Sequence, residues 1–523
     1  MSLHFKLYPN LYKDSVSLMQ LSARVGALDG VDQASVAMAT EANIERMRDV
    51  GMAIDAAARP NDLLIALIAR DSESGERALA EAGDWLKPAA DDGDAGGGVR
   101  QAPPSSLAAG KEVMPDANLA LISVPGAYAA AEALKSLRLG LDVMIFSDNV
   151  PLAEEIAVKN VATASDRIVM GPDCGTAIVN GLPLGFANVV RRGRIGLIAA
   201  SGTGLQEVCC RIHHRDEGVS QALGTGGHDL HEAVGGQSML QGLKMLAADP
   251  GTALIVLISK PPSAAVTEKV LAAASRCGKP VVVHFLGADA SVLAPYRVIP
   301  AFSLCHAGDV AVATLRGEAP PTDAAADADL LAKASAALVG RKPGQGDIRG
   351  VFAGGTFCYE AQLALLAAGL TCASNVPVKG AVALGDAVGG HRLVDMGDDE
   401  FTQGRPHPMI DPTVRDARIL AEANDPATAI IVFDVVLGYG ASFAPIDGLL
   451  GVLEQARQTA QRDGRALLFI GHVCGTELDP QSRDALIDAL RQAGVLVADS
   501  NVQAARVAAN CAANCAAQLA KTL

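Results

Sequence analysis

The sequence predicts an α/β protein with a small N-terminal α+β unit, a parallel-sheet region and two duplicated domains, each with a doubly wound sheet. Three observations support this fold class. The chain has 523 residues, which is too long for one hydrophobic core. Half of its residues are hydrophobic and only 3% are aromatic, a composition typical of buried parallel strands that alternate with helices. The stretch "IAASGTGLQEV" at 198–208 also returns without a gap as "VFAGGTFCYEA" at 351–361.

The first segment, residues 11–95, has the pattern of the small α+β unit. Its stretch "DSVSLMQLSARVGALDG" repeats apolar residues near helical period, whereas "VDQASVAMAT" and "NDLLIALIARD" have the composition of strands. In residues 89–112, Gly, Pro, Ala and Ser replace the residues that build cores. We therefore expect a mobile loop or linker at 89–112.

Residues 113–184 follow with a different texture. The stretch "NLALISVPGAYAAAEALKSLRLGLDVMIFSD" contains a strand, a helix and a second strand, which is one βαβ unit of a parallel sheet. The next stretch, "DRIVMGPDCGTAIVNG", predicts a strand that runs into a turn. A parallel-sheet region is therefore expected over 113–184.

The two copies of the repeat are expected at 185–320 and 345–515. "AADPGTALIVLISKPP" returns as "ANDPATAIIVFDVVLG", and "GKPVVVHFLG" returns more weakly as "GRALLFIGHVCG". Each copy is predicted to contain a strand, a Gly-Thr turn, a helix, a strand, a helix and a strand, as in a doubly wound domain. The second copy is about 23 residues longer between its turn and its Asp-Pro pair, and the extra residues include "DMGDDEFTQGRPHPMID".

Charge and composition exclude several classes of function. The net charge of −15 argues against nucleic acid or an anionic membrane as a partner, since both require concentrated Lys and Arg. The ten cysteines are scattered, without the spacing of a zinc site or a disulfide framework. The N-terminus lacks the apolar core of a signal peptide, and no run of about 20 apolar residues occurs. A cytoplasmic protein is expected.

The repeated turns are the strongest candidates for chemistry. A strand that ends in Ser-Gly-Thr-Gly and enters a helix leaves backbone N–H groups where the helix dipole favours an anion. The predicted phosphate- or anion-binding residues are Ser201, Gly202, Thr203, Gly354, Gly355 and Thr356. Neither turn matches a P-loop or a full dinucleotide-binding fingerprint. A single turn of this kind could equally be an ordinary helix cap, but two aligned copies favour a functional interpretation.

Other polar residues follow predicted strands. Glu207 and Glu360 occupy equivalent positions in the repeat; they are either ordinary acids of a first helical turn or groups that orient a histidine or a substrate N–H. Lys260, Arg405 and His407 are candidates to neutralise a carboxylate or phosphate of the substrate. The run Asp398, Asp399 and Glu400 could hold Mg²⁺, but such runs more often form solvated loops, so no metal site is predicted.

The residues resemble two known families. "GPDCGT", "RIGLIAASGTGLQEV", "GTGGHDL" and "DPGTALIVLISKPP" resemble the α subunit of succinyl-CoA synthetase. "FAGGTFCYEA", "DMGDDEFTQGRPHPMID" and "DPATAIIVFDVVLGYG" resemble the FdrA family of acyl-CoA synthetase-like proteins, and this resemblance extends over nearly the whole chain. It implies a CoA-binding-like domain at 113–184 and two flavodoxin-like, succinyl-CoA synthetase-like domains after it.

The synthetase resemblance implies a phosphohistidine between two helix N-termini. "SLCHAGDVAVATL" offers His306 for this role, although the same residues fit the start of an amphipathic helix. The sequence has no glycine-rich CoA loop near its start and no stretch after the repeat long enough for an ATP-grasp domain, so ATP-dependent ligation by this chain alone is not expected.

The FdrA resemblance implies another chemistry. FdrA-type proteins have been linked to purine breakdown as one component of a multi-subunit oxamate carbamoyltransferase, which converts oxalurate and phosphate into oxamate and carbamoyl phosphate. Three hypotheses follow: a carbamoyl-transferring subunit, a CoA-ligase component that is phosphorylated on His306 and paired with an ATP-grasp subunit, and a non-catalytic scaffold. No cofactor is certain under the first hypothesis, phosphate or carbamoyl phosphate being a substrate; CoA enters under the second. The expected partners are a small anionic substrate and further subunits in a homo- or hetero-oligomer.

Overall fold

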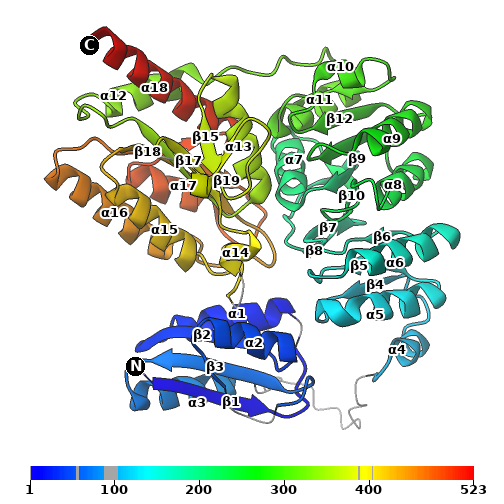
Figure 1. Cartoon of the computed structure of the whole chain (residues 1–523). Helices are drawn as coiled ribbons and strands as arrows, with labels where there is room; N and C mark the ends of the chain where they lie inside the picture. The colour runs from blue at the N-terminus through cyan, green and yellow to red at the C-terminus, as the bar shows by residue number, and fades with distance from the viewer. Residues whose placement is uncertain are drawn as a thin grey trace.

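The computed structural model describes residues 2–13, 15–54, 58–86, 104–386, 389–402 and 405–522. The strands of these residues form two three-stranded and two seven-stranded sheets. Figure 1 shows the N-terminal unit below two larger bodies, one for each copy of the repeat. The expected α/β class, with a small α+β unit followed by several parallel sheets, is confirmed.

The N-terminal unit is an antiparallel sheet with helices. Its elements are β1 (Ser2–Tyr8), α1 (Ser15–Gly26), β2 (Val31–Met38), α2 (Glu41–Asp49), β3 (Leu63–Ala69) and α3 (Ser72–Trp85). Strand β3 lies in the middle, antiparallel to both β1 and β2. The unit therefore includes a strand ahead of the expected range 11–95.

A second small sheet is parallel. Its elements are α4 (Leu107–Val113), β4 (Leu119–Ile122), α5 (Gly126–Arg138), β5 (Asp142–Ile145), α6 (Leu152–Ala164) and β6 (Val169–Met170). Helix α4 is a difference from the linker expected at 89–112: Ser106 caps it by accepting a hydrogen bond from the Ala109 N–H. The rest of that expected linker, up to residue 103, lies outside the described residues.

The first copy forms a seven-stranded sheet. Its strands are β7 (Thr176–Val179), β8 (Leu182–Gly185), β9 (Arg192–Ala200), β10 (Val219–Gly224), β11 (Leu254–Ser259), β12 (Val281–Phe285) and β13 (Ile299–Pro300). Its helices are α7 (Gly202–His214), α8 (Gln237–Ala248), α9 (Ala264–Arg276), α10 (Ala290–Leu293) and α11 (Leu304–Arg316). The parallel strands lie in the order β13-β12-β11-β9-β10, which is the 2-1-3-4-5 order of a doubly wound sheet. The hairpin β7-β8 pairs with β10 at one edge, so this sheet begins before residue 185.

The second copy follows α12 (Ala328–Ala337). Its strands are β14 (Asp347–Phe352), β15 (Cys372–Ser374), β16 (Val382–Ala383), β17 (His391–Asp395), β18 (Thr428–Val436), β19 (Leu468–Cys474) and β20 (Leu496–Ala498). Its helices are α13 (Gly355–Ala367), the 3-10 helix η1 (Leu384–Asp386), α14 (Asp399–Thr402), α15 (Thr413–Asn424), α16 (Asp447–Arg462), α17 (Arg483–Gln492) and α18 (Asn501–Thr522). Strand β17 lies between β15 and β14, parallel to both. The first copy has no equivalent strand, since β10 lies directly beside β9, and β17 falls in the longer stretch of the second copy.

The two copies share one hydrophobic core. Its buried side chains include Val208 of α7, Val310 of α11, Phe357 of α13 and Ala504 of α18. Helices α8 and α9 cover the other face of the first sheet, and α15 and α16 cover the other face of the second. The four inner helices are therefore held between the two sheets, with α7 and α13 in direct contact. Within the described part of the chain, no helix combines the length and hydropathy needed to span a membrane.

Candidate functional site

The two Gly-Thr turns touch each other between the copies. The first follows β9 and opens α7, and the second follows β14 and opens α13. Ser201 Oγ lies 2.6 Å from Thr356 Oγ1, and a Cβ on Gly354 would lie 3.0 Å from the methyl carbon of Thr203. We refer to residues 201–203 and 354–356 as the paired turns. Ser201 and Thr356 are the first and last of the predicted anion-binding residues in the sequence, and they are neighbours in the fold.

The first turn keeps free backbone donors. Ser201 is the N-cap of α7, and its hydroxyl accepts a hydrogen bond of 3.0 Å from the Gly204 N–H. Among the described residues, no acceptor bonds to the N–H groups of Gly202 and Thr203. Such groups at the start of a helix bind anions readily.

The second turn is built differently because its cap, Gly354, has no side chain. Buried Asp434 of β18 takes the role, accepting from the N–H groups of Ala353 at 2.6 Å and Gly354 at 2.7 Å. Burial raises the pKa of Asp434, and these hydrogen bonds oppose the rise. The next two N–H groups, on Gly355 and Thr356, have no acceptor within the described ranges.

Asp395 stands beside the second turn. It is the last residue of β17, pairs in register with Phe352 of β14, and is only 7% exposed. One carboxylate oxygen, Oδ1, accepts from the Gly397 N–H at 2.9 Å, and the other, Oδ2, lies so close to Gly355 that a Cβ there would overlap it. Burial raises the pKa of Asp395 to about 6, while the Gly397 N–H and the charge of Lys260 oppose the rise.

Lys260 reaches from the first copy toward the second. It follows β11, is exposed, and its Nζ lies 5.6 Å from the centroid of the Tyr359 ring on α13. The charge of Lys260 also lowers the pKa of Asp395. Lys260 of the first copy therefore lies against the helix that the second turn opens.

The other two predicted substrate-binding residues, His407 and Arg405, differ from Lys260 in their surroundings. His407 packs its ring 6.0 Å from that of Phe186, and loss of solvent lowers its pKa to about 4. Its Nδ1 accepts from the Met409 N–H at 3.2 Å, so Nε2 carries the proton, and this nitrogen lies close to Gly397. His407 is therefore a neutral hydrogen-bond donor and not a cation at neutral pH. Arg405 is exposed, and its guanidinium makes no hydrogen bond or ion pair to the described residues.

Glu207 contacts a histidine of the second copy. Glu207 Oε2 lies 2.8 Å from Nε2 of His472 on β19, and both side chains are buried. The His472 Nδ1 faces the Ala498 carbonyl oxygen at 3.4 Å. Burial disfavours both charges, but their attraction and hydrogen bond outweigh it, so the pKa of Glu207 is lowered and that of His472 is raised. An imidazolium that donates from both nitrogens matches this geometry.

Glu360 has a different set of partners. Its Oε1 accepts from the Leu304 N–H of α11 at 2.9 Å, and its Oε2 accepts from Nδ2 of Asn501 on α18 at 2.8 Å. Burial raises the pKa of Glu360 to about 7, against these two bonds. Glu360 thus joins the starts of two helices from different copies.

His306 lies inside α11, with both ring nitrogens engaged. Its Nδ1 accepts from the Phe302 N–H at 3.1 Å, so Nε2 carries the proton and donates to the Pro321 carbonyl at 2.9 Å. The side chain is 5% exposed and its ring stacks on that of Phe302. The histidine considered for phosphorylation is therefore held by protein groups at both nitrogens in this structure.

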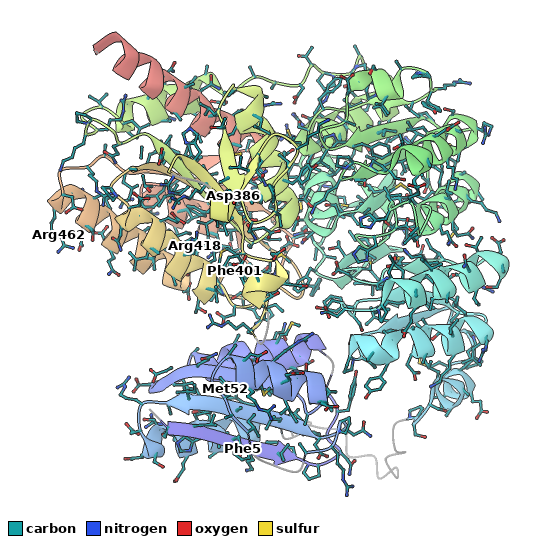
Figure 2. The ribbon with its side chains drawn as sticks, in the orientation of Figure 1. Phe5, Met52, Asp386, Phe401, Arg418 and Arg462 are labelled. Atoms are coloured by element: carbon teal, nitrogen blue, oxygen red, sulfur yellow. The ribbon has the colours of Figure 1, made fainter. Side chains whose placement is uncertain are left out.

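The acidic run Asp398, Asp399 and Glu400 lies at the start of α14. Asp399 and Glu400 are exposed in the first turn of α14. Phe401, the next residue of this helix, is labelled in Figure 2. Within the described ranges, no three His, Cys, Asp or Glu side chains gather closely enough to hold a metal ion.

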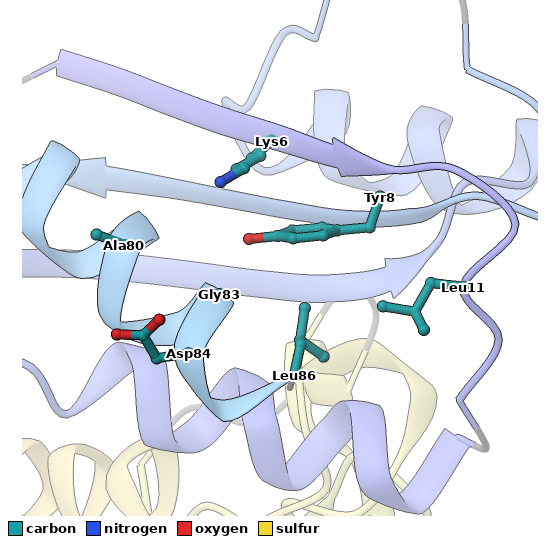
Figure 3. Close-up of a pocket in the computed structure, with 7 residues that line it drawn as sticks. All are labelled: Lys6, Tyr8, Leu11, Ala80, Gly83, Asp84 and Leu86. Carbon is teal, nitrogen blue, oxygen red and sulfur yellow. The ribbon is translucent and has the colours of Figure 1, made fainter. Parts of the chain in front are cut away.

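A separate pocket lies in the N-terminal unit. Figure 3 shows this pocket of about 510 Å³ between β1 and α3. It is lined by Lys6, Tyr8, Leu11, Ala80, Gly83, Asp84 and Leu86. None of these residues belongs to the paired turns, so this pocket and the candidate site are separate.

Asp395, Asp434 and His472 are absent from the residues that the sequence suggested. Two of them carry a signal in hindsight, because Asp434 and His472 interrupt the apolar strands "TAIIVFDVV" and "LFIGHVC". A charged residue at the centre of a buried strand requires a partner. Asp395 ends its strand among polar residues and carries no such signal.

Two family models match the chain. A model described as CoA-ligase matches residues 351–511, and a model described as AllF, heavy metal-associated domain, matches residues 1–103. Those first 103 residues contain no cysteine and a single histidine, His4. The thiolates that bind soft metal ions are thus missing from this part of the sequence, and no metal chemistry is assigned to it.

Relatives are similar to the chain over different lengths. The uncharacterised protein YahF of Escherichia coli is 41% identical over 506 residues, which cover 96% of this chain and 97% of that protein. The mitochondrial succinate–CoA ligase subunit alpha-2 of Trichomonas vaginalis is 32% identical over 150 residues, 28% of this chain and 47% of that subunit. A solved ATP citrate lyase of Methanothrix soehngenii, in complex with citrate and coenzyme A, aligns with a TM-score of 0.36 and 16% identity over 46% of each chain.

Proposed function

The chain belongs to the same family as Escherichia coli YahF, with a CoA-ligase domain and an AllF-type N-terminal domain, and from this premise we propose that it is a subunit of a carbamoyl-transferring enzyme. The proposed reaction converts oxalurate and phosphate into oxamate and carbamoyl phosphate. The observation that carries the proposal is the contact between the paired turns through Ser201 and Thr356. Unbonded N–H groups on both sides of this contact suit one phosphoryl group.

The phosphate is proposed to bind at the paired turns. The N–H groups of Gly202, Thr203, Gly355 and Thr356 would donate to its oxygens, as would the hydroxyls of Ser201 and the two threonines. Gly354 contributes through the close approach that its missing side chain allows. Lys260, which reaches across from the first copy, would hold the carboxylate of the substrate.

The chemical step then needs no covalent intermediate on the protein. A phosphate oxygen bonds to the carbamoyl carbon of oxalurate, and the bond from that carbon to the oxamate nitrogen breaks. The proton of the phosphate passes to the leaving nitrogen, so charge and atoms balance. Positioned N–H donors would stabilise the negative charge that forms on the carbamoyl oxygen.

The remaining predicted residues take supporting roles in this proposal. Glu207 and Glu360 are buried and bonded to protein groups, so we assign them the positioning of α7 and α13 and not contact with the substrate. His407 would donate from Nε2 to a substrate oxygen. Arg405 stays a predicted carboxylate ligand, without a supporting contact.

A second candidate function is a CoA-ligase component that acts through His306. It is favoured by the CoA-ligase model at 351–511 and by the succinate–CoA ligase relative, which is named as one subunit of its enzyme. The engagement of both His306 nitrogens favours the carbamoyl-transfer proposal instead.

One experiment separates these functions from a scaffold role. The purified chain, alone and with the proteins encoded beside it, is incubated with carbamoyl phosphate and oxamate, and in parallel with ATP, CoA and small acids. Phosphate release and protein mass are followed. Carbamoyl transfer without phosphorylation of the chain is expected. Acid-labile phosphate on His306 would favour the CoA-ligase function. If turnover survives replacement of both Thr203 and Thr356, the paired turns have a structural role only.

A further inference from the structure

The paired turns are not equivalent, and the difference lies in one strand. The first turn follows β9, whose neighbours in the sheet are β10 and β11. The second turn follows β14, which pairs with β17, the strand that only the second copy contains. Strand β17 ends at Asp395, directly beside the second turn. The insertion therefore brings a carboxylate to one side of a site whose other groups are hydrogen-bond donors.

Asp395 is held firmly in this position. Its backbone N–H donates to Asn375 Oδ1 at 3.0 Å, and its carbonyl accepts from Asn375 Nδ2 at 3.0 Å. The Gly397 N–H fixes Oδ1. Among the described residues, no donor bonds to Oδ2, and this oxygen is not one of the side-chain atoms that are both unpaired and closed off from solvent. A carboxylate oxygen that has no protein donor and remains open to solvent can accept a hydrogen bond from a ligand.

We propose that Asp395 selects the carbamoyl group, its Oδ2 accepting a hydrogen bond from the NH₂ of a carbamoyl compound whose phosphoryl group lies on the paired turns. This inference rests on the proposed function and specifies how its site recognises substrate. A carboxylate beside the paired turns disfavours the binding of an anion that has no N–H group. A ligand that donates an N–H to the carboxylate offsets this repulsion. An acetyl group has a methyl where the carbamoyl group has NH₂ and leaves Oδ2 unpaired, which a site built for an N–H rejects strongly.

The same contact separates the two candidate reactions. A CoA ligase handles acyl phosphates, which carry carbon at this position, whereas carbamoyl phosphate carries nitrogen. Asp395 would therefore be a specificity-determining residue that makes the site unsuitable for acetyl phosphate. The charged groups around it are Lys260, Asp398 and Asp434, with the thiol of Cys358 and the neutral ring of His407 also nearby.

The test compares two stable phosphonates on the full-length chain. Phosphonoacetamide carries the carbamoyl NH₂, acetonylphosphonate carries a methyl in its place, and inorganic phosphate reports on the turns alone. Calorimetry or ligand-observed NMR at pH 7.5 gives the three affinities. Wild type is expected to bind phosphonoacetamide at least tenfold more tightly than acetonylphosphonate.

The variant Asp395→Asn sharpens the test. Because the Gly397 N–H holds the oxygen at Oδ1, the new amide places its NH₂ at the Oδ2 position, facing the ligand's own NH₂. The preference should fall to about one or below, while inorganic phosphate binds as well as before or more tightly. Asp399→Asn, which removes an exposed charge from the nearby helix α14, should keep the wild-type preference.

The outcomes distinguish the inference from the proposed function. If inorganic phosphate binds to wild type but the two phosphonates bind equally, the selection by Asp395 is wrong and the anion site stands. A preference that survives in Asp395→Asn, provided that variant binds phosphate, leads to the same conclusion. If none of the three ligands binds to wild type, both the anion site and the inference are wrong.

Discussion

At the scale of single residues, the contact between Ser201 and Thr356 is the centre of the candidate site. Their hydroxyl oxygens lie 2.6 Å apart across 155 positions of sequence. Ser201 belongs to the first copy and Thr356 to the second. Substitution of the two residues, singly and together, therefore tests whether the copies act together. Groups that act as one unit show effects that do not add.

The first prediction concerns this pair. Ser201→Ala and Thr356→Val should each weaken the binding of inorganic phosphate about tenfold, and the double variant should cost clearly less than the product of the two. Titration of phosphate by calorimetry measures the cycle, with Thr413→Val, on the outer helix α15, as a control. Additive losses would mean that the two hydroxyls bind the anion independently.

The second prediction concerns His306. Since both its nitrogens are bonded within the protein, His306→Asn should keep carbamoyl transfer within about fivefold of wild type and should form no acid-labile phosphate. Turnover and intact mass of the assembled enzyme measure this. A loss of turnover by a thousandfold in a variant that remains folded would contradict direct transfer.

The third prediction follows from the pKa of Asp395, which burial raises to about 6. The carboxyl group is ionised above that pH and accepts an N–H; it is protonated below it. The preference for phosphonoacetamide over acetonylphosphonate should therefore be full near pH 7.5 and decline as the pH falls through about 6. His407, with a pKa near 4, stays neutral over this range. Asp395→Asn is the control, because its ratio should not change with pH.

At the scale of elements, the buried pair of Glu207 and His472 fastens α7 of the first copy to β19 of the second. Breaking a buried pair from one side leaves an uncompensated charge, which typically costs about 3–5 kcal/mol. The fourth prediction is that Glu207→Gln or His472→Gln lowers the free energy of unfolding by about this amount, and that the double variant loses less than either. Urea denaturation followed by circular dichroism measures it.

The pH dependence of this stabilisation has a defined sign. The lowered pKa of Glu207 gives stability above its ordinary value of 4.5 that is lost as the pH falls through the folded pKa. The raised pKa of His472 gives stability below its ordinary value of 6.5 that is lost as the pH rises through the folded pKa. The contribution of the pair is thus largest between about pH 4.5 and 6.5, and the double variant should lack it. An unchanged pH profile in that variant would contradict the charged pair.

The elements also show what the sequence could predict. The Gly-Thr turns and the strands before them follow from local sequence patterns that occur twice. The sequence therefore predicts both the type and the position of these elements. The role of Glu207 was not, because its partner is 265 positions away and only the packing of two copies brings them together. Asp395 depends on the insertion of β17 between two strands, a matter of strand order that local periodicity does not encode.

At the scale of the molecule, a polar network fixes the orientation of the copies. Asp479 of the second copy accepts from Asn188 Nδ2 at 2.8 Å and from the Val189 N–H at 2.7 Å. Asn188 also accepts from Gln206 on α7 at 3.1 Å. These bonds join the segment before β9 to the loop after β19, close to the start of α7.

The fifth prediction follows from this network. Asp479→Asn would turn an amide NH₂ toward groups that are themselves donors, so the copies should lose their fixed orientation while each sheet stays folded. Phosphate affinity should fall at least tenfold with far-ultraviolet circular dichroism unchanged, and hydrogen exchange should rise at 186–190. Asp488→Asn, at an exposed ion pair on α17, is the control. Unaltered phosphate binding in Asp479→Asn would show that the network does not set the contact between the turns.

The separation of Ser201 and Thr356 has a consequence for synthesis in the cell. Ribosomes add roughly 5–20 residues per second, so the 155 positions between the two hydroxyls correspond to roughly 8–30 s of translation. During that interval the first copy presents α7, and after residue 316 also α11, without the helices of the second copy that bury them. Nascent chains of this length should therefore recruit chaperones, and added phosphate should protect only released, full-length protein from proteolysis.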